Sequence, residues 1–309
     1  MHRAALALLA LLLLPAAVSA EPLERATAQL ASAQRDAGDL EATWTWKRDG
    51  KTLAPNSAGL VALSLVRAWE RSGSDAAREA ALRWGDARVA DLAEWRRLFD
   101  PDVEALAELG RVSGNHVYTD AARQLFERRW SGATAEEVVG RLVHVRERQQ
   151  ALIGYDLALV IRAARAVGEK DFAGELARQI LARPVVWEAE AEGRGWATTS
   201  RAALLGALNG LPGKDLSRAR GRLAADLVKA QEADGSWAHR NTQATAYAVE
   251  ALTPRKEARS AVKKGRAWLT RTQLTDGSWA AYHDGLPEPF VGDVVHEVTA
   301  EVVLALAAR

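Results

Sequence analysis

Apolar residues recur at intervals of three and four along most of the chain, as at Leu60, Leu63 and Val66. This spacing puts them on one face of an α-helix. Runs of β-branched residues are short, whereas alanine, leucine, arginine and glutamate, which favour helices, are abundant. The pattern predicts an all-α protein.

Glycine and proline divide the helical pattern into pieces of similar length. Gly73, Gly168 and Pro254, for example, each follow an apolar segment and precede a more polar one. Each piece is long enough for two helices of roughly four turns joined by a loop. The sequence therefore predicts helical hairpins over six spans, 22–73, 74–114, 118–168, 171–213, 214–254 and 255–309.

The two helices of a hairpin differ in polarity. The first is charged and amphipathic, as in residues 218–229, and the second is apolar on nearly every side, as in residues 202–208. A helix that is apolar all round is buried all round. A closed ring with the second helices inside satisfies this requirement, and the many alanines allow the inner helices to lie close together. We therefore expect an α6/α6 toroid; an open solenoid of the same hairpins is the alternative.

One short motif occurs twice near the C-terminus. Residues 231–237 and 273–279 both read Gln-x-x-Asp-Gly-Ser-Trp, 42 residues apart, and a Thr-Ala-rich apolar run follows each. A fixed period of this size indicates a repeated supersecondary unit. We expect the glycines to supply left-handed turns, the tryptophans to pack on a neighbouring hairpin and the glutamine amides to tie the turn. The residues with this structural role are Gln231, Gly235, Trp237, Gln273, Gly277 and Trp279.

This motif resembles the repeat shared by squalene-hopene cyclases, oxidosqualene cyclases and protein prenyltransferase β subunits, the terpene cyclase/protein prenyltransferase superfamily. The match is specific over 231–252 and 273–306. It is degenerate at 33–38, which keep the Gln and the Gly without the Trp, and at 193–196, which keep the Gly and the Trp without the Gln. The resemblance implies an α6/α6 toroid for the whole chain.

The first twenty residues have the features of a secretory signal peptide. A basic start is followed by an alanine- and leucine-rich run and by small residues up to Ala20. We expect cleavage there, which leaves residues 21–309 as a single domain that is secreted or periplasmic. A membrane anchor is the alternative, but Pro15 and the small residues argue against it, and no other apolar run is long enough to cross a bilayer.

Composition narrows the classes of partner. The chain has no cysteine, so neither disulfides nor thiolate ligands hold the fold. Its 41 basic and 40 acidic residues are interspersed, which does not favour a nucleic-acid or anionic-membrane surface. A small molecule or a polysaccharide is the expected ligand, and nothing identifies a protein partner.

The last hairpin departs from the repeat where its second helix begins. When the two Thr-Ala runs are aligned, His296 and Glu297 stand where the preceding hairpin has Thr242 and Gln243. Glu301 lies four residues after Glu297 on the same helix face, and two neighbouring carboxylates raise the pKa of one of them. We therefore expect catalytic chemistry at Glu297 and His296, with Asp293 orienting them. The alternative is a capping arrangement, in which Asp293 caps the helix and Glu301 reaches an arginine.

Two family comparisons concern this stretch. Residues 293–296 are similar to the Asp-x-x-His of prenyltransferase β subunits, where the His binds zinc, but the Asp and Cys that complete that site have no counterpart. Catalytic zinc needs three protein ligands, so no metal or other cofactor is expected. Residues 297–301 resemble an oxidosqualene cyclase element, yet the Asp-x-Asp-Asp acid of hopene cyclases is missing at 100–103. Terpene cyclisation or prenyl transfer is therefore a second alternative only.

Secreted lyases and hydrolases of carbohydrates also use a single α/α toroid. Trp44 and Trp46 lie in a polar loop where indole rings can stack on sugars, or where they can instead close the ring. Other residues expected to contact a ligand are Tyr247, His283, Glu301 and Asp156. The sequence thus favours binding or acid/base cleavage of a polymeric carbohydrate in the central funnel. A non-catalytic binding module of the cell envelope is the first alternative, and whether the protein is an enzyme stays open here.

Overall fold

The computed structural model describes residues 21–37, 40–93, 99–146, 153–183, 196–281 and 292–309. The signal peptide predicted for residues 1–20 lies outside these ranges. No helix among the described residues has both the length and the apolar character needed to cross a membrane.

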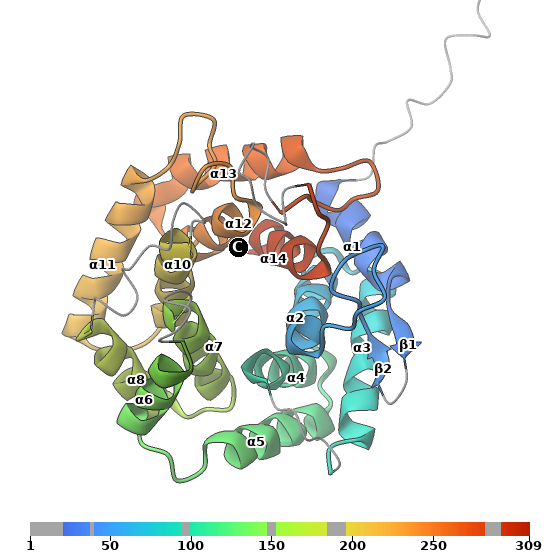
Figure 1. The fold of residues 1–309 in the computed structure, drawn as a ribbon, viewed down its shortest axis with the longest axis horizontal. Helices are drawn as coiled ribbons and strands as arrows, with labels where there is room; N and C mark the ends of the chain where they lie inside the picture. Colours follow the sequence, from blue (N-terminus) through green and yellow to red (C-terminus); the bar gives the residue numbers. More distant parts are fainter. Residues whose placement is uncertain (1–20, 38–39, 94–98, 147–152, 184–195, 282–291) are drawn as a thin grey trace, which may run out of the picture.

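An inner ring of helices surrounds the axis of the molecule (Figure 1). Each inner helix packs on the next one in the chain, and the last packs on the first, so the ring is closed. The α/α toroid predicted from the sequence is therefore confirmed, and the open solenoid is excluded. Within the described ranges the inner helices are α2 (Pro55–Ser72), α4 (Asp100–Ser113), α7 (Ile153–Ala166), α10 (Trp196–Leu208), α12 (Thr242–Leu252) and α14 (His296–Ala307).

The inner helices lie inside because apolar residues cover most of their surface. In α2, for example, Leu60 to Leu63 are four consecutive residues with at most 2% of their surface exposed. Residues in succession point to different sides of a helix, so burial of all four means burial on every side. The hydrophobic core therefore fills the space between the inner and the outer helices.

A second layer of helices covers the inner ring. Between α5 and α7 the chain forms an additional helix, α6, which packs on α7 and α8, so the third predicted hairpin contains three helices rather than two. The outer helices of the described residues are α1 (Pro22–Ser32), α3 (Asp75–Ala90), α5 (His116–Trp130), α6 (Ala135–Arg146), α8 (Lys170–Leu181), α11 (Lys214–Lys229) and α13 (Arg259–Thr272), with the short 3-10 helix η1 (Lys256–Ala258) before α13.

The inner helices all run in the same direction, because the chain passes through an outer helix before each inner one. Their first turns therefore lie at one end of the ring, which we name the N-terminal end. Residues near the ends of all six inner helices line a single cavity at the opposite, C-terminal end. The two ends consequently differ in helix dipole and in side-chain chemistry.

The first copy of the tryptophan repeat ties one outer helix to the next, α11 to α13. Gln231 donates from Nε2 to the carbonyl of Gly235 in its own turn (3.0 Å) and to that of Ala261 in the next outer helix (2.9 Å). Trp237 is fully buried and donates from Nε1 to the carbonyl of Leu227 (2.7 Å). These contacts give the motif a structural role at the junction of two hairpins.

The second copy of the repeat closes the ring. Gln273 donates from Nε2 to the carbonyls of Gly277 (2.9 Å) and Pro22 (2.8 Å), and Pro22 begins α1. Buried Trp279 donates to the carbonyl of Leu269 (2.7 Å), as Trp237 does one hairpin earlier. The last outer helix is thereby fastened to the first.

A third copy is present in the first hairpin. Gln34 donates to the carbonyls of Ala42 (3.3 Å) and Ala80 (2.9 Å), and Trp44 donates to that of Leu30 (2.8 Å). Ala42 has a φ of 50°, the left-handed conformation that glycine has in the other two copies. The turn is longer here because β1 (Arg35–Ala37) and β2 (Leu40–Thr43) pair as a two-stranded antiparallel sheet inside it.

The segment after β2 also joins the first hairpin to the last. The backbone N–H of His296 donates to the carbonyl of Trp46 (3.0 Å), and that of Arg48 donates to the carbonyl of Val294 (3.0 Å). We name residues 44–53 the arm. It holds the start of α14 in place at the N-terminal end of the ring.

Candidate functional site

Two carboxyl groups of α14 face the interior of the ring at its N-terminal end. Glu301 is 2% exposed, and Glu297, one turn nearer the helix start, keeps part of its surface accessible. Burial raises the pKa of both side chains, and the charge of Glu297 raises the pKa of Glu301 further, to well above its usual range. Glu297 therefore ionises before Glu301, and the environment of Glu301 favours its protonated form.

The neighbours of Glu301 determine which oxygen carries that proton. Gln243 of α12 donates from Nε2 to Glu301 Oε1 (2.8 Å). Glu301 Oε2 is buried and has no hydrogen-bond partner among the described residues. Because Oε1 accepts a hydrogen bond, the proton belongs on Oε2. This O–H group lies near the hydroxyl of Tyr247, whose influence lowers the pKa of Glu301 against the effect of burial.

Two tyrosines accompany the carboxyl pair. The rings of Tyr155 on α7 and Tyr247 on α12 meet edge to face, with centroids 5.5 Å apart and an angle of 88°. The hydroxyl of Tyr247 is buried and lies close enough to Tyr155 and Glu301 to influence the pKa of each. Burial raises the pKa of both tyrosines, and the charges of Glu297 and Glu301 raise that of Tyr155 further. Both hydroxyls are therefore neutral donors.

A second pair of acids begins α4. Asp100 accepts hydrogen bonds from Trp130 Nε1 (2.7 Å) and Arg129 Nε (3.1 Å), which fix its orientation. Asp102 is 2% exposed, and burial raises its pKa to about 8, against the opposing charge of Arg88. Asp102 is therefore a second carboxyl group that is protonated near neutral pH.

Asp156 lies within electrostatic reach of Asp100 in α4 and of Tyr155, which in turn senses the charges of Glu297 and Glu301. Its charge contributes to the raised pKa of Asp100, after the larger effect of burial, and to that of Tyr155. It occupies the first turn of α7, between α4 and α10 in the ring. The acids of α4, α7 and α14 thus belong to one region at the N-terminal end.

His296 and Asp293 contact residues of the arm and do not lie among these acids. His296 is 1% exposed, and its Nδ1 lies 2.7 Å from the carbonyl oxygen of Thr45; burial lowers its pKa. Asp293 forms an ion pair with Lys47 (2.7 Å). The capping alternative does not hold, because Val295 is the N-cap of α14 and makes no side-chain capping bond, and because Glu301 is bonded to Gln243 instead of an arginine.

The remaining predicted ligand residues are dispersed. Trp44 is 1% exposed and occupies the tryptophan position of the third repeat, so its ring is not available to stack on a ligand. Trp46 is half-buried and packs near Val298, and the centroid of its ring lies 5.9 Å from Lys47 Nζ. His283 lies outside the described residues. Of the residues predicted from the sequence, the structure therefore brings together Glu297, Glu301 and Tyr247, with Asp156 nearby.

Four residues of this region were not selected from the sequence: Tyr155, Gln243, Asp100 and Asp102. Gln243 carried a signal, because it aligns with Glu297 in the repeat. Asp100 and Asp102, on either side of Pro101, were also visible in the sequence, but acids are common at helix starts because of the helix dipole alone, so they did not point to a site. Tyr155 carried no signal, because its contact with Tyr247 joins helices far apart in the chain. No cluster of three or more potential metal ligands occurs among the described residues.

The chain matches no model of a protein family, and the comparison with curated proteins gives no match either. Solved structures share its fold at low sequence identity. A polysaccharide lyase has a TM-score of 0.59 at 12% identity, with 93% of this chain and 94% of the lyase covered. An α-1,6-mannanase of Salegentibacter sp., an inactive variant in complex with α-1,6-mannotetrose, has a TM-score of 0.64 at 12% identity, with 93% and 97% covered.

A third structure with this fold has a different chemistry. It is a type II terpene cyclase from Scytonema, with a TM-score of 0.59 at 16% identity and with 93% of this chain and 95% of the cyclase covered. At such identities the likeness concerns the fold, and fold alone does not define function. This chain accordingly has the α/α-toroid fold that is found in enzymes acting on carbohydrates and in terpene cyclases.

Proposed function

We propose that the N-terminal end of the ring binds a polysaccharide and cleaves it by acid/base chemistry. The observation that carries this proposal is the Glu297–Glu301 pair, in which burial and the charge of Glu297 raise the pKa of Glu301 well above its usual range. An acid with a pKa raised to the working pH range is what protonation of a glycosidic oxygen requires.

The two glutamates then have different roles. Glu301 donates its Oε2 proton to the oxygen of the bond that breaks, and Gln243 holds the other oxygen in place. Glu297, which is more accessible and ionises first, accepts a proton. In a hydrolase that proton comes from the attacking water, and in a lyase it comes from the sugar carbon next to a carboxyl group. The hydroxyl of Tyr247 supplies a further donor to the sugar.

The arm positions Glu297 from the outer side of α14. His296 and Asp293 fasten the start of the helix to Thr45 and Lys47, so they act on the reaction through the orientation of the adjacent glutamate. Export through the predicted signal peptide brings the protein to the cell envelope or the exterior, where polysaccharides occur. The shared fold of the lyase and the mannanase supports a carbohydrate ligand.

The chemistry of the site favours sugars over terpenes. Carboxyl, amide and phenol groups converge at the N-terminal end, and they suit a ligand rich in hydroxyl groups. A hydrocarbon terpene offers no hydrogen-bonding partner to carboxyl groups such as those of Glu297 and Glu301. The terpene cyclase neighbour therefore informs the fold and not the substrate.

The test is activity on a panel of neutral and acidic polysaccharides. We expect Glu301→Gln to lower the rate by at least about 10²-fold, in line with the contribution of a general acid, and Glu297→Gln to do the same. Glu127→Gln, which changes an exposed glutamate of α5, is the matched control and leaves the rate unchanged. Ultraviolet absorbance of an unsaturated product identifies a lyase, and new reducing ends without it identify a hydrolase.

Two results would contradict the proposal. One is a wild-type activity that survives in both glutamine variants. The other is binding of a polysaccharide without turnover, which would instead support the non-catalytic binding module.

A further inference from the structure

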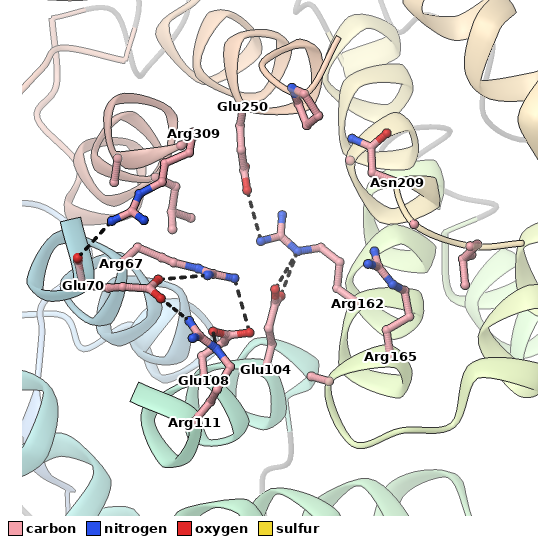
Figure 2. Close-up of a pocket in the computed structure, with 18 of the residues that line it drawn as sticks. Arg67, Glu70, Glu104, Glu108, Arg111, Arg162, Arg165, Asn209, Glu250 and Arg309 are labelled. Atoms are coloured by element: carbon pink, nitrogen blue, oxygen red, sulfur yellow. Dashed lines mark hydrogen bonds and ion pairs between the residues drawn. The ribbon is translucent and has the colours of Figure 1, made fainter. Parts of the chain in front are cut away.

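A large cavity lies at the C-terminal end of the ring, away from the carboxyl pair. It measures about 990 Å³, and residues from all six inner helices and their following loops line it. Figure 2 shows that charged side chains from several helices point into it. A cavity of this size can hold an oligosaccharide or another ligand of similar bulk.

The carboxylates of this cavity are already used in ion pairs. Each of three arginines is paired with two glutamates: Arg67 with Glu70 (3.4 Å) and Glu108 (3.3 Å), and Arg111 with the same two (2.8 Å each). Arg162 is paired with Glu104 (2.8 Å) and Glu250 (3.3 Å) (Figure 2). These networks fix the wall of the cavity but leave no carboxylate for further cations.

Four more cations line the same cavity. Arg165 and Lys170 belong to α7 and α8, whereas Arg71 and Arg309 lie at the end of α2 and after α14. Among the described residues none of the four forms an ion pair with a carboxylate. The cavity thus has seven cationic and four acidic side chains, and the surplus lies on two sides of it.

Arg165 is the best-defined of these four cations. It donates from Nη1 to the carbonyl of Ala207 (2.8 Å), and burial lowers its pKa. A Cβ at position 210 would come within 3.2 Å of its Nη2, so Gly210 leaves room for the guanidinium group. One N–H thus caps the end of α10, while a guanidinium group has five N–H donors in all. The others are available to an anion.

Helix dipoles explain part of this charge, since cations are favoured at helix C-termini. Arg165 and Arg309 do bond to the backbone carbonyls of Ala207 and Glu70. Arg71 and Lys170 make no side-chain hydrogen bond or ion pair in the described part of the chain, so capping does not account for them. Both side chains are exposed to solvent, so an anion that enters the cavity can reach them.

We propose that the C-terminal end of the ring binds a ligand with at least two oxyanion groups, carboxylates or phosphates. Arg165 and Lys170 contact one group, and Arg71 and Arg309 contact the other. The paired arginines keep the wall rigid between them. This proposal does not rest on the proposed cleavage at the other end, and either can fail without the other.

Calorimetric titration of the full chain at low salt tests this inference. The probes are trigalacturonate, pyrophosphate and a neutral mannose oligomer of similar length. We expect trigalacturonate or pyrophosphate to bind, with affinity that falls as salt increases, and the neutral oligomer not to bind at this end. Comparison of the two anions identifies whether carboxylates or phosphates are preferred.

Variants locate the binding. The double change Arg71→Gln and Lys170→Gln alters two exposed side chains, so we expect the fold to be kept, and it should weaken anion binding roughly tenfold or more. Arg165→Gln should weaken it further. Arg259→Gln, an exposed arginine outside the cavity, is the charge-matched control and should bind as the wild type does.

The inference is overturned if neither anion binds to the wild-type protein. It is also overturned if the double variant binds as tightly as the wild type, or if Arg259→Gln weakens binding equally, because the attraction would then be a property of the whole surface. Glu301→Gln should leave anion binding unchanged.

Discussion

Burial is the largest cause of the raised pKa of both Glu301 and Asp102, and a neighbouring carboxylate adds to it in each case, Glu297 for Glu301 and Asp100 for Asp102. They differ in that Glu297 keeps part of its surface accessible, whereas both Asp100 and Asp102 are buried. A Cβ built on Gly59 of α2 would come within 2.5 Å of the backbone nitrogen of Asp102, so the glycine allows α4 to pack this closely. The first environment suits proton transfer, and the second makes the stability of the fold depend on pH.

Asp102→Asn should remove that dependence. The pKa of Asp102 is about 8 in the fold against a usual value of 3.8. Between these values the unfolded chain releases the proton and the folded chain does not, so the wild type loses stability as pH rises, by up to ~1.4 kcal/mol per pH unit. Chemical unfolding measured across this range should show a smaller loss in the variant. Equal slopes for the two proteins would contradict the assignment.

Single residues also show where sequence interpretation reaches its limit. Gln34 and Trp44 have the contacts of the repeat, but the glycine between them is replaced by Ala42 and the turn is lengthened by a small sheet. Neither change alters the hydrogen bonds of Gln34 and Trp44, but together they make the repeat motif unrecognisable in the sequence. Trp44 was therefore open to interpretation as a sugar-stacking residue, although its ring is in the core.

At the scale of elements, periodicity and breakers predicted most of the architecture. The inner helices could be identified because a helix that is apolar on every side must be buried on every side, and this can be judged for each helix separately. α6 was missed although the sequence marks its start: Gly132 has a φ of 72° between α5 and α6, and Thr134 and Glu137 bond to each other's backbone N–H at the first turn of α6. Its packing on α8 is a tertiary contact, which the sequence does not show. Cross-helix contacts such as Tyr155 with Tyr247 are beyond a single sequence for the same reason.

The turn at Gly277 allows a test of how closely the last repeat packs against α1. Gly277 has a φ of 92°, and a Cβ there would lie 2.5 Å from the carbonyl oxygen of Arg25 in α1. Gly277→Ala should therefore destabilise the protein by roughly 3 kcal/mol, from backbone strain and from displacement of α1. Gly73→Ala, at a φ of 72° with open space around it, should cost only ~1 kcal/mol. Similar losses in thermal unfolding would mean that the close approach of α1 is unimportant.

At the scale of the whole molecule, the parallel inner helices give the ring two chemically different ends. Acids gather at the N-terminal end and unpaired cations at the C-terminal end, each matching the sign of the helix dipoles. The sequence indicated the acids of α14 through a break in the repeat. It could not indicate the cationic cavity, because Arg71, Lys170 and Arg309 lie in separate elements that only ring closure brings together.

Closure of the ring should itself depend on pH. Burial lowers the pKa of His296, which lies against the carbonyl of Thr45 in the arm. Below the usual value of 6.5 the unfolded chain gains a proton that the folded chain resists, so wild-type stability falls as pH falls. His296→Gln should be less stable at neutral pH and should lose less on acidification to about pH 5. Denaturant unfolding at both pH values provides the measurement; parallel losses would show that His296 does not titrate in this way.

The joining of the first and last hairpins has a consequence for synthesis. Thr45 and His296 are 251 positions apart, and Gln273 and Pro22 are also 251 apart. During translation α1 and α2 are complete long before α13 and α14 exist, so the nascent chain passes through an open arc whose two ends lack their neighbours. Contacts this distant in sequence form slowly, since a long loop must close first. The last hairpin to be synthesised thus both closes the ring and contributes the Glu297–Glu301 pair.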